Sequence, residues 1–207
     1  MADAAILQSL RARIREIEGL PPVTRPRDPS GLPGLDALIG GLPRPGIVEI
    51  VGQPGTGRTR VAAALVAERI RCRTEVAWVD GDGILHPPGL SVLGVALSHL
   101  LVVRPPPDGT EVVAWTAEQL LRSGCFSLVI LSSSSGIGRW GGHNFARAAE
   151  HGRCTALVLS RTPSRDLPAD VRVSVGDGRI AVLRDRSGRS GGEAALPGWT
   201  EEANPWA

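Results

Sequence analysis

Residues 46–59 have the sequence Gly-Ile-Val-Glu-Ile-Val-Gly-Gln-Pro-Gly-Thr-Gly-Arg-Thr. A short apolar run bounded by glycine is typical of a buried strand, and the Ala-rich stretch after the turn is typical of a helix. Within it, Gly52, Gly57, Arg58 and Thr59 follow the spacing GxxxxG-[K]-[ST] of a phosphate-binding loop. Such loops bind phosphate through converging backbone N–H groups and a helix N-terminus, so these four residues form a candidate nucleotide site.

Position 58 departs from this motif, because Arg stands where Lys normally reaches between the β- and γ-phosphates. A compact ammonium fits there as a point charge, whereas a planar guanidinium is larger and prefers a two-pronged geometry. All 23 basic residues of the chain are Arg, so genomic base composition is one explanation of the change. We expect weak nucleotide or anion binding by the loop amides and no other cofactor.

Predicted strands and helices alternate along the rest of the chain, which predicts an α/β fold with a mostly parallel central sheet flanked by helices. After the first strand, further strands are predicted at residues 75–80, 100–103, 127–131 and 155–160, and helices at residues 59–71, 90–96, 111–122 and 145–150. A C-terminal β-hairpin is predicted from residues 171–175 and 179–184, joined by the turn Gly176-Asp177-Gly178.

Three segments are predicted around a core of residues 46–185. Residues 1–19 form an amphipathic N-terminal helix, residues 20–45 a Pro- and Arg-rich linker and lead-in segment with a short helix at 35–39, and residues 186–207 a flexible Gly/Ser/Arg-rich tail. Apolar residues of the helix and the tail are candidate protein-interaction sites, which contact either this domain or a partner: Leu10, Ile14, Ile17, Trp199 and Trp206.

The composition limits the class of protein. Of the 207 residues, 42 % are hydrophobic, which is enough for a packed core, and the net charge of +2 gives no strong nucleic-acid or membrane signature. No apolar run is long enough to span a membrane, so a cytoplasmic protein is expected. Cys72, Cys125 and Cys154 lack the spacing of metal ligands and are predicted to be buried thiols; the four histidines are scattered, so no metal site is expected.

Several segments are similar, in the same order, to segments of RecA. They include the strand and turn at Gly41–Gly52, the sequence Val-Asp-Gly-Asp-Gly-Ile-Leu-His-Pro at residues 79–87, and the shorter matches Leu93–Val95, Leu100–Leu101, Pro107–Asp108 and Arg122–Gly124. The sequence GLPGLDALIGGLPR at residues 31–44, the small size and the N-terminal helix resemble the ImuA family, whose members are RecA-like accessory proteins of bacterial mutagenesis cassettes.

The resemblance implies that most catalytic positions of RecA have changed here. The catalytic glutamate corresponds to Asp82, the magnesium-associated aspartate to Ser132, and the γ-phosphate-sensing glutamine lies near Thr162. His86 and Gly89 stand where RecA has an adenine-contacting acid and a stacking tyrosine. These changes predict a degenerate nucleotide site without catalytic residues, and hence a pseudo-ATPase that is not an enzyme.

The RecA loops that hold single-stranded DNA correspond to residues 132–142 and 161–170, both short here. Arg139, Trp140, Arg161 and Arg165 are candidate DNA contacts, and weak, salt-sensitive binding is expected. The resemblance to ImuA implies a nucleoid-associated accessory protein of DNA-damage-induced translesion synthesis. Its implied partners are an ImuB-type inactive Y-family polymerase protein, an error-prone replicative-type polymerase, and RecA itself.

Two other functions fit the same residues. The first is a divergent DNA-dependent ATPase or recombinase of the RecA/RadA type, in which Arg58 replaces the lysine and Asp80 or Asp82 serves the metal. The second is a damage-induced cell-division inhibitor, since such proteins share the resemblance to RecA.

Overall fold

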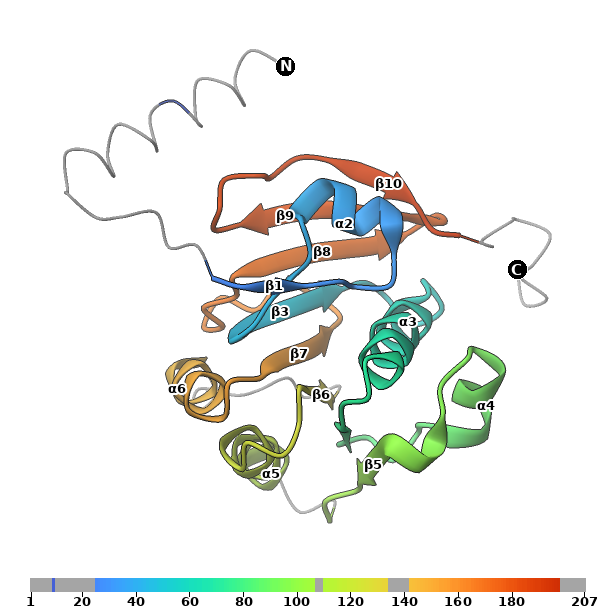
Figure 1. Cartoon of the computed structure of the whole chain (residues 1–207), viewed down its shortest axis with the longest axis vertical. Helices are drawn as coiled ribbons and strands as arrows, with labels where there is room; N and C mark the ends of the chain where they lie inside the picture. Colours follow the sequence, from blue (N-terminus) through green and yellow to red (C-terminus); the bar gives the residue numbers. More distant parts are fainter. Residues whose placement is uncertain (1–8, 10–24, 107–109, 134–141, 198–207) are drawn as a thin grey trace.

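An eight-stranded sheet forms the centre of the molecule in the computed structural model, which describes residues 9, 25–106, 110–133 and 142–197 (Figure 1). The strand order is β10-β9-β8-β3-β7-β6-β4-β5. Neighbouring strands from β8 to β5 are parallel, and β9 and β10 are antiparallel additions. The strands are β3 (Gly46–Val51), β4 (Val76–Asp80), β5 (Leu100–Val103), β6 (Leu128–Ser132), β7 (Thr155–Ser160), β8 (Val171–Gly176), β9 (Arg179–Asp185) and β10 (Glu193–Ala195). The predicted α/β fold with a mostly parallel sheet is confirmed.

Helices cover both faces of this sheet (Figure 1). Side chains alternate along β3, so that Val48 and Ile50 join the apolar core under α3 (Arg58–Arg71), while Ile47 joins the core under α5 (Thr110–Arg122) and α6 (Gly142–Gly152). The remaining helical elements are α2 (Pro33–Ile39), α4 (Pro87–Val92) and the 3-10 turn η1 (Leu97–His99). Burial on both faces explains why the central strands are continuous apolar runs.

The C-terminal β-hairpin of β8 and β9 is confirmed, and its turn has the expected chemistry. Asp177 and Gly178 have φ angles of 48° and 68°. Positive φ at both central residues is the requirement of the type I′ turn that joins twisted antiparallel strands. The predicted N-terminal helix of residues 1–19 lies outside the described residues, apart from Ser9.

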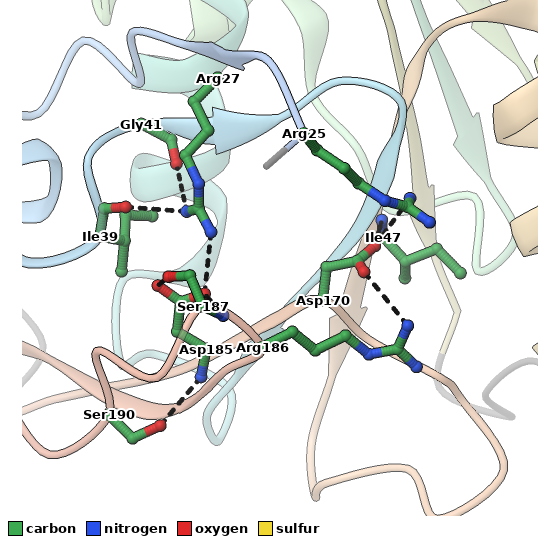
Figure 2. A network of polar contacts seen from close by, with 10 residues as sticks. All are labelled: Arg25, Arg27, Ile39, Gly41, Ile47, Asp170, Asp185, Arg186, Ser187 and Ser190. Carbon is green, nitrogen blue, oxygen red and sulfur yellow. Dashed lines mark hydrogen bonds and ion pairs between the residues drawn. The ribbon is translucent and has the colours of Figure 1, made fainter. Parts of the chain in front are cut away.

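The segment predicted as a linker is part of the folded domain from Arg25 onward. It contains strand β1 (Arg27–Asp28), which pairs with β2 (Leu42–Pro43), and it contains α2 between them. Arg27 donates to the carbonyls of Ile39 and Gly41 at 2.8 and 3.0 Å, and it pairs with Asp185 at 2.9 Å (Figure 2). These long-range bonds, which composition does not reveal, hold the Pro- and Arg-rich segment on the sheet.

The prediction of a flexible tail from residue 186 is wrong for residues 186–197. Asp185 organises the turn after β9: its carboxylate accepts from the backbone N–H and the hydroxyl of Ser187, at 2.9 and 2.7 Å, and its own N–H donates to Ser190 at 3.0 Å (Figure 2). The chain then returns as β10 along β9, and Leu196 is buried in the core. The Gly/Ser/Arg-rich composition therefore belongs to a tight turn.

The three cysteines differ from the prediction, because Cys72 and Cys125 are exposed and only Cys154 is buried. Burial raises the pKa of the Cys154 thiol to about 12. Within the described ranges, no helix combines the length and the apolar character that crossing a bilayer requires.

Candidate nucleotide-binding site

A pocket of about 760 Å³ lies at the carboxyl edge of the parallel strands. Its walls come from the loop after β3, the loop after β4 with helix α4, and the carboxyl ends of β6 and β7, as is usual for ligand sites of open α/β sheets. Of the predicted nucleotide residues, the pocket brings together Gly57, Arg58, Thr59, Asp82 and Ser132. Gly52, which directly follows β3, is not among the residues that line the pocket.

The phosphate loop has the backbone that its glycines permit. A Cβ at Gly52 would lie 2.5 Å from Thr56 Oγ1 and 2.6 Å from the carbonyl oxygen of Val175, so only glycine fits at this close approach. Gly57, which precedes the first residue of α3, has a φ of 94°. Thr56 closes the turn by donating its N–H and hydroxyl to the carbonyl of Gln53, at 3.2 and 2.8 Å.

Arg58 is half-buried in the pocket, and two other charges act on it. Its pKa is lowered, first by burial and then by the positive charge of Arg161, while the negative charge of Asp82 opposes this. Neither guanidinium has a hydrogen-bond acceptor among the parts of the chain that the structure describes. The pocket therefore holds two neighbouring cations that suit an anionic ligand.

The side chain of Asp80 stabilises the loop after β4 through hydrogen bonds and an ion pair. Its buried carboxylate accepts from the backbone N–H groups of Ile84 and Leu85, at 3.2 and 3.0 Å, and pairs with Arg104 at 3.1 Å. A carboxylate with these partners is poorly placed to take a metal as well. Asp82 lies on the exposed part of that loop and lines the pocket.

Ser132, at the end of β6, is engaged by a buried tryptophan. The indole N–H of Trp78 donates to Ser132 Oγ at 2.9 Å, and Trp78 is 1 % exposed. The hydroxyl thus satisfies an indole that would otherwise be a buried, unpaired donor. Trp78 is a pocket residue that sequence reasoning missed, because only the pairing of β4 with β6 places it beside Ser132.

The residues predicted to contact DNA do not form one group. Arg161 lines the pocket, whereas Arg165 is exposed and is not among the pocket residues. Arg139 and Trp140 lie outside the described residues. The same holds for the predicted protein-interaction residues Leu10, Ile14, Ile17, Trp199 and Trp206. In the described part of the chain, no cluster of three or more His, Cys, Asp or Glu side chains could hold a metal ion.

Comparison with known families matches residues 29–139, just over half of the chain, to the RecA N-terminal domain. The chain belongs to the RecA N-terminal domain family. The match begins before α2 and covers the phosphate loop, Asp82 and Ser132. The similarity to RecA that the phosphate loop and the matching segments predict is thus confirmed at the level of this family.

The curated relatives are RecA proteins. The chain is 39 % identical over 106 residues to RecA of Picosynechococcus sp., 34 % identical over 131 residues to RecA of Ruminococcus albus, and 38 % identical over 107 residues to RecA of Nocardioides sp.. These matches cover 51 %, 62 % and 51 % of this chain. The chain spans only 30 % of the length of each of these relatives.

These comparisons overturn one prediction. The changes at Arg58, Asp82 and Ser132 predict a pseudo-ATPase that is not an enzyme, yet the family and the relatives are those of RecA, a DNA-dependent ATPase. A motif compares one position at a time and does not include residues that the tertiary structure brings to the site. Arg161 is such a residue and adds a second cation to the pocket.

Proposed function

We propose that this chain is a RecA-type DNA-dependent ATPase that binds Mg-ATP at its phosphate loop. The observation that carries the proposal is the presence of Arg58, Thr59 and Asp82 around one pocket at the carboxyl edge of the sheet. The loop amides and the N-terminus of α3 suit phosphate oxygens, and Arg58 supplies positive charge beside them. The volume of about 760 Å³ is in the range of small-molecule sites.

Two oxygen-bearing side chains in the pocket are suitable ligands for a nucleotide-bound magnesium ion. Thr59 offers a hydroxyl at the start of α3, and Asp82 offers a carboxylate on the facing loop. Mg²⁺ commonly takes one or two protein ligands together with substrate phosphates and water, and it neutralises the charge that develops on those phosphates. Asp82 would also orient the attacking water. Because aspartate is one methylene shorter than glutamate, we expect slower turnover than in RecA.

The test is Mg-ATP hydrolysis by the full chain, with and without single-stranded DNA. Arg58→Ala should lower kcat/KM by about tenfold or more, since a charge-assisted hydrogen bond contributes on the order of 1.5–3 kcal/mol. Asp82→Asn should lower kcat by about a hundredfold and also weaken Mg-ATP binding, because it removes a carboxylate that serves both the metal and the attacking water. Arg71→Ala is the matched control, because Arg71 is exposed at the opposite end of α3. Hydrolysis that is absent, or identical in all four proteins, would overturn the proposal.

We also propose that this activity contributes to DNA-damage-induced translesion synthesis. The resemblance of residues 31–44 to the ImuA family supports it. Leu101 on β5 and Val112 and Trp115 on α5 are exposed by 46, 36 and 61 %, and apolar side chains of this size are typical of protein interfaces. The proposed partners are an ImuB-type protein, an error-prone replicative-type polymerase, and RecA, with weak DNA binding in addition.

Co-purification of the full chain with each proposed partner tests this role, and a chain lacking residues 1–19 tests the predicted helix. Retention of the ImuB-type protein, reduced by Trp115→Ala, is the expected result. Capture of the cell-division GTPase in its place would favour the division-inhibitor function. Failure to retain any of the three proposed partners would overturn the role and leave the ATPase proposal standing.

A further inference from the structure

Arg161 lies beside the phosphate loop because of how β7 pairs with β3. The N–H of Gly52 donates to the carbonyl of Ser160 at 3.1 Å, and the side-chain amide of Gln53 donates to the carbonyl of Arg161 at 3.5 Å. These two bonds join the start of the loop to the end of β7. The side chains of Arg161 and Arg58 then line the same pocket, although more than 100 positions separate them in the chain.

A buried ion pair between β3 and β8 holds the segment that follows Arg161. Glu49, in the middle of β3, pairs with Arg172 on β8 and accepts from the N–H of Ser164 at 2.9 Å. Arg172 donates in turn to the carbonyl of Ser164 at 2.6 Å. Arg161 thus leaves β7 on a short loop that is tied down three residues later, which limits the positions its guanidinium can take.

The charges of the pocket make this arrangement costly without a ligand. The two guanidinium groups repel one another and burial disfavours the charge of Arg58, while the negative charge of Asp82 offsets part of this cost. In the described part of the chain, neither group has an acidic side chain bound to it by an ion pair. Two cations that line one pocket without an ion pair of their own are characteristic of sites that bind an oppositely charged ligand.

We propose that Arg161 is a second phosphate-binding cation of this site, which acts with Arg58 on the polyphosphate of a nucleotide. This inference rests on the proposed nucleotide-binding function and adds a specificity to it. Each guanidinium offers parallel N–H donors that match phosphate oxygens, so two of them bind a longer phosphate chain better than a short one. The site should therefore prefer ATP to ADP and ADP to AMP, and Arg161 should contribute to that preference.

In this role Arg161 contacts the nucleotide and not DNA. Arg161 and Arg165 belong to the same short loop and were both predicted to contact DNA. Arg161 lines the pocket and Arg165 does not. Arg165→Ala is therefore a matched control, since it removes the same charge from the same loop.

The experiment is calorimetric titration of the full chain with Mg-ATP, Mg-ADP and AMP in the absence of DNA, for the wild type, Arg161→Ala, Arg161→Lys and Arg165→Ala. Arg161→Ala should weaken ATP binding by about ten- to a hundredfold, the range for loss of a charge-assisted hydrogen bond. ADP binding should weaken less and AMP binding should not change. Arg161→Lys should recover part of the ATP affinity, and Arg165→Ala should bind as the wild type does. Thermal unfolding of each variant confirms that it is folded.

The outcomes separate this inference from the proposed function. If the wild type binds ATP and Arg161→Ala binds it equally well, the inference is wrong and the proposed function stands. Loss of single-stranded DNA binding with unchanged ATP affinity would also overturn it and return Arg161 to the DNA surface. If the wild type binds no nucleotide, the proposed function fails and the inference fails with it.

Discussion

At the scale of single residues, the phosphate loop depends on the absence of a side chain at Gly52. A methyl group there would meet Thr56 Oγ1 at 2.5 Å and the carbonyl oxygen of Val175 at 2.6 Å. Gly52→Ala should therefore lower the free energy of unfolding by about 1–3 kcal/mol, as overpacking does, and weaken nucleotide binding by displacing the loop. Urea denaturation measures the first effect and titration with Mg-ATP the second.

Gly176→Ala is the control for this prediction. Gly176 ends β8, its φ is not positive, and a Cβ would have no neighbour within 4 Å. The substitution should change stability by less than about 0.5 kcal/mol. Equal stabilities for the two variants would show that the space around Gly52 is not limiting.

Cys154 gives the protein an alkaline limit of stability. Its folded-state pKa is raised from 9.0 to about 12 by burial, so the folded protein keeps the thiol proton over a range in which the unfolded chain releases it. The contribution of Cys154 to the free energy of unfolding is fully present below pH 9. It decreases as pH rises toward 12, by up to about 1.4 kcal/mol per pH unit. The chain has no Tyr and no Lys, so few other groups titrate there.

Denaturation of the wild type, Cys154→Ala and Cys72→Ala at pH 8 and pH 10 tests this origin of the slope. The wild type and the exposed-thiol variant Cys72→Ala should both lose stability between the two pH values. Cys154→Ala should lose clearly less. A slope that survives in Cys154→Ala would assign it to another group.

At the scale of elements, the buried pair of Glu49 and Arg172 joins β3 to β8 and to the loop after β7. The Glu49 side chain is 0 % exposed and that of Arg172 is 15 % exposed. Removing the arginine leaves a buried carboxylate without its partner, so Arg172→Met should cost on the order of 3–5 kcal/mol of stability. Arg179→Met, which breaks an exposed pair with Glu193, should cost less than about 1 kcal/mol.

The double variant Glu49→Leu with Arg172→Met separates pairing from packing. Replacing both partners by apolar groups removes the uncompensated charge, so most of the lost stability should return. The loop that carries Arg161 would still lose its bond to β3, because the N–H of Ser164 has no acceptor after Glu49→Leu. A double variant as unstable as Arg172→Met alone would contradict this account of the pair.

At the scale of the whole molecule, the two ends of the described chain complete the fold together. Helix α2 packs on β10, and Leu196 is buried in the same core as Leu35 and Ile39. A chain ending at residue 186 should therefore be less stable than one ending at residue 197 by several kcal/mol, of which burial of Leu196 alone accounts for roughly 2 kcal/mol. Thermal unfolding of the two truncated chains provides the comparison; equal Tm values would show that β10 is dispensable.

The sequence by itself determined strands β3 to β9 and the phosphate loop. Apolar runs at residues 46–51, 76–80 and 155–160 are long enough and regular enough to indicate buried strands, and the spacing from Gly52 to Thr59 is a local property of one turn. The β-hairpin at Asp177-Gly178 was equally local. In each case a few consecutive residues are enough to reveal the physical requirement, which is burial for the strands and a positive φ for the turns.

Only the tertiary structure decided which distant residues meet. Arg27 bonds to Asp185, 158 positions away, and Glu49 bonds to Arg172, 123 positions away. These contacts turned a predicted linker and part of a predicted tail into folded structure. Strand order likewise placed Trp78 beside Ser132 and Arg161 beside Arg58. Periodicity and motif spacing describe neighbours along the chain, whereas the charge and the hydrogen bonds of the pocket come from strands paired across the sheet.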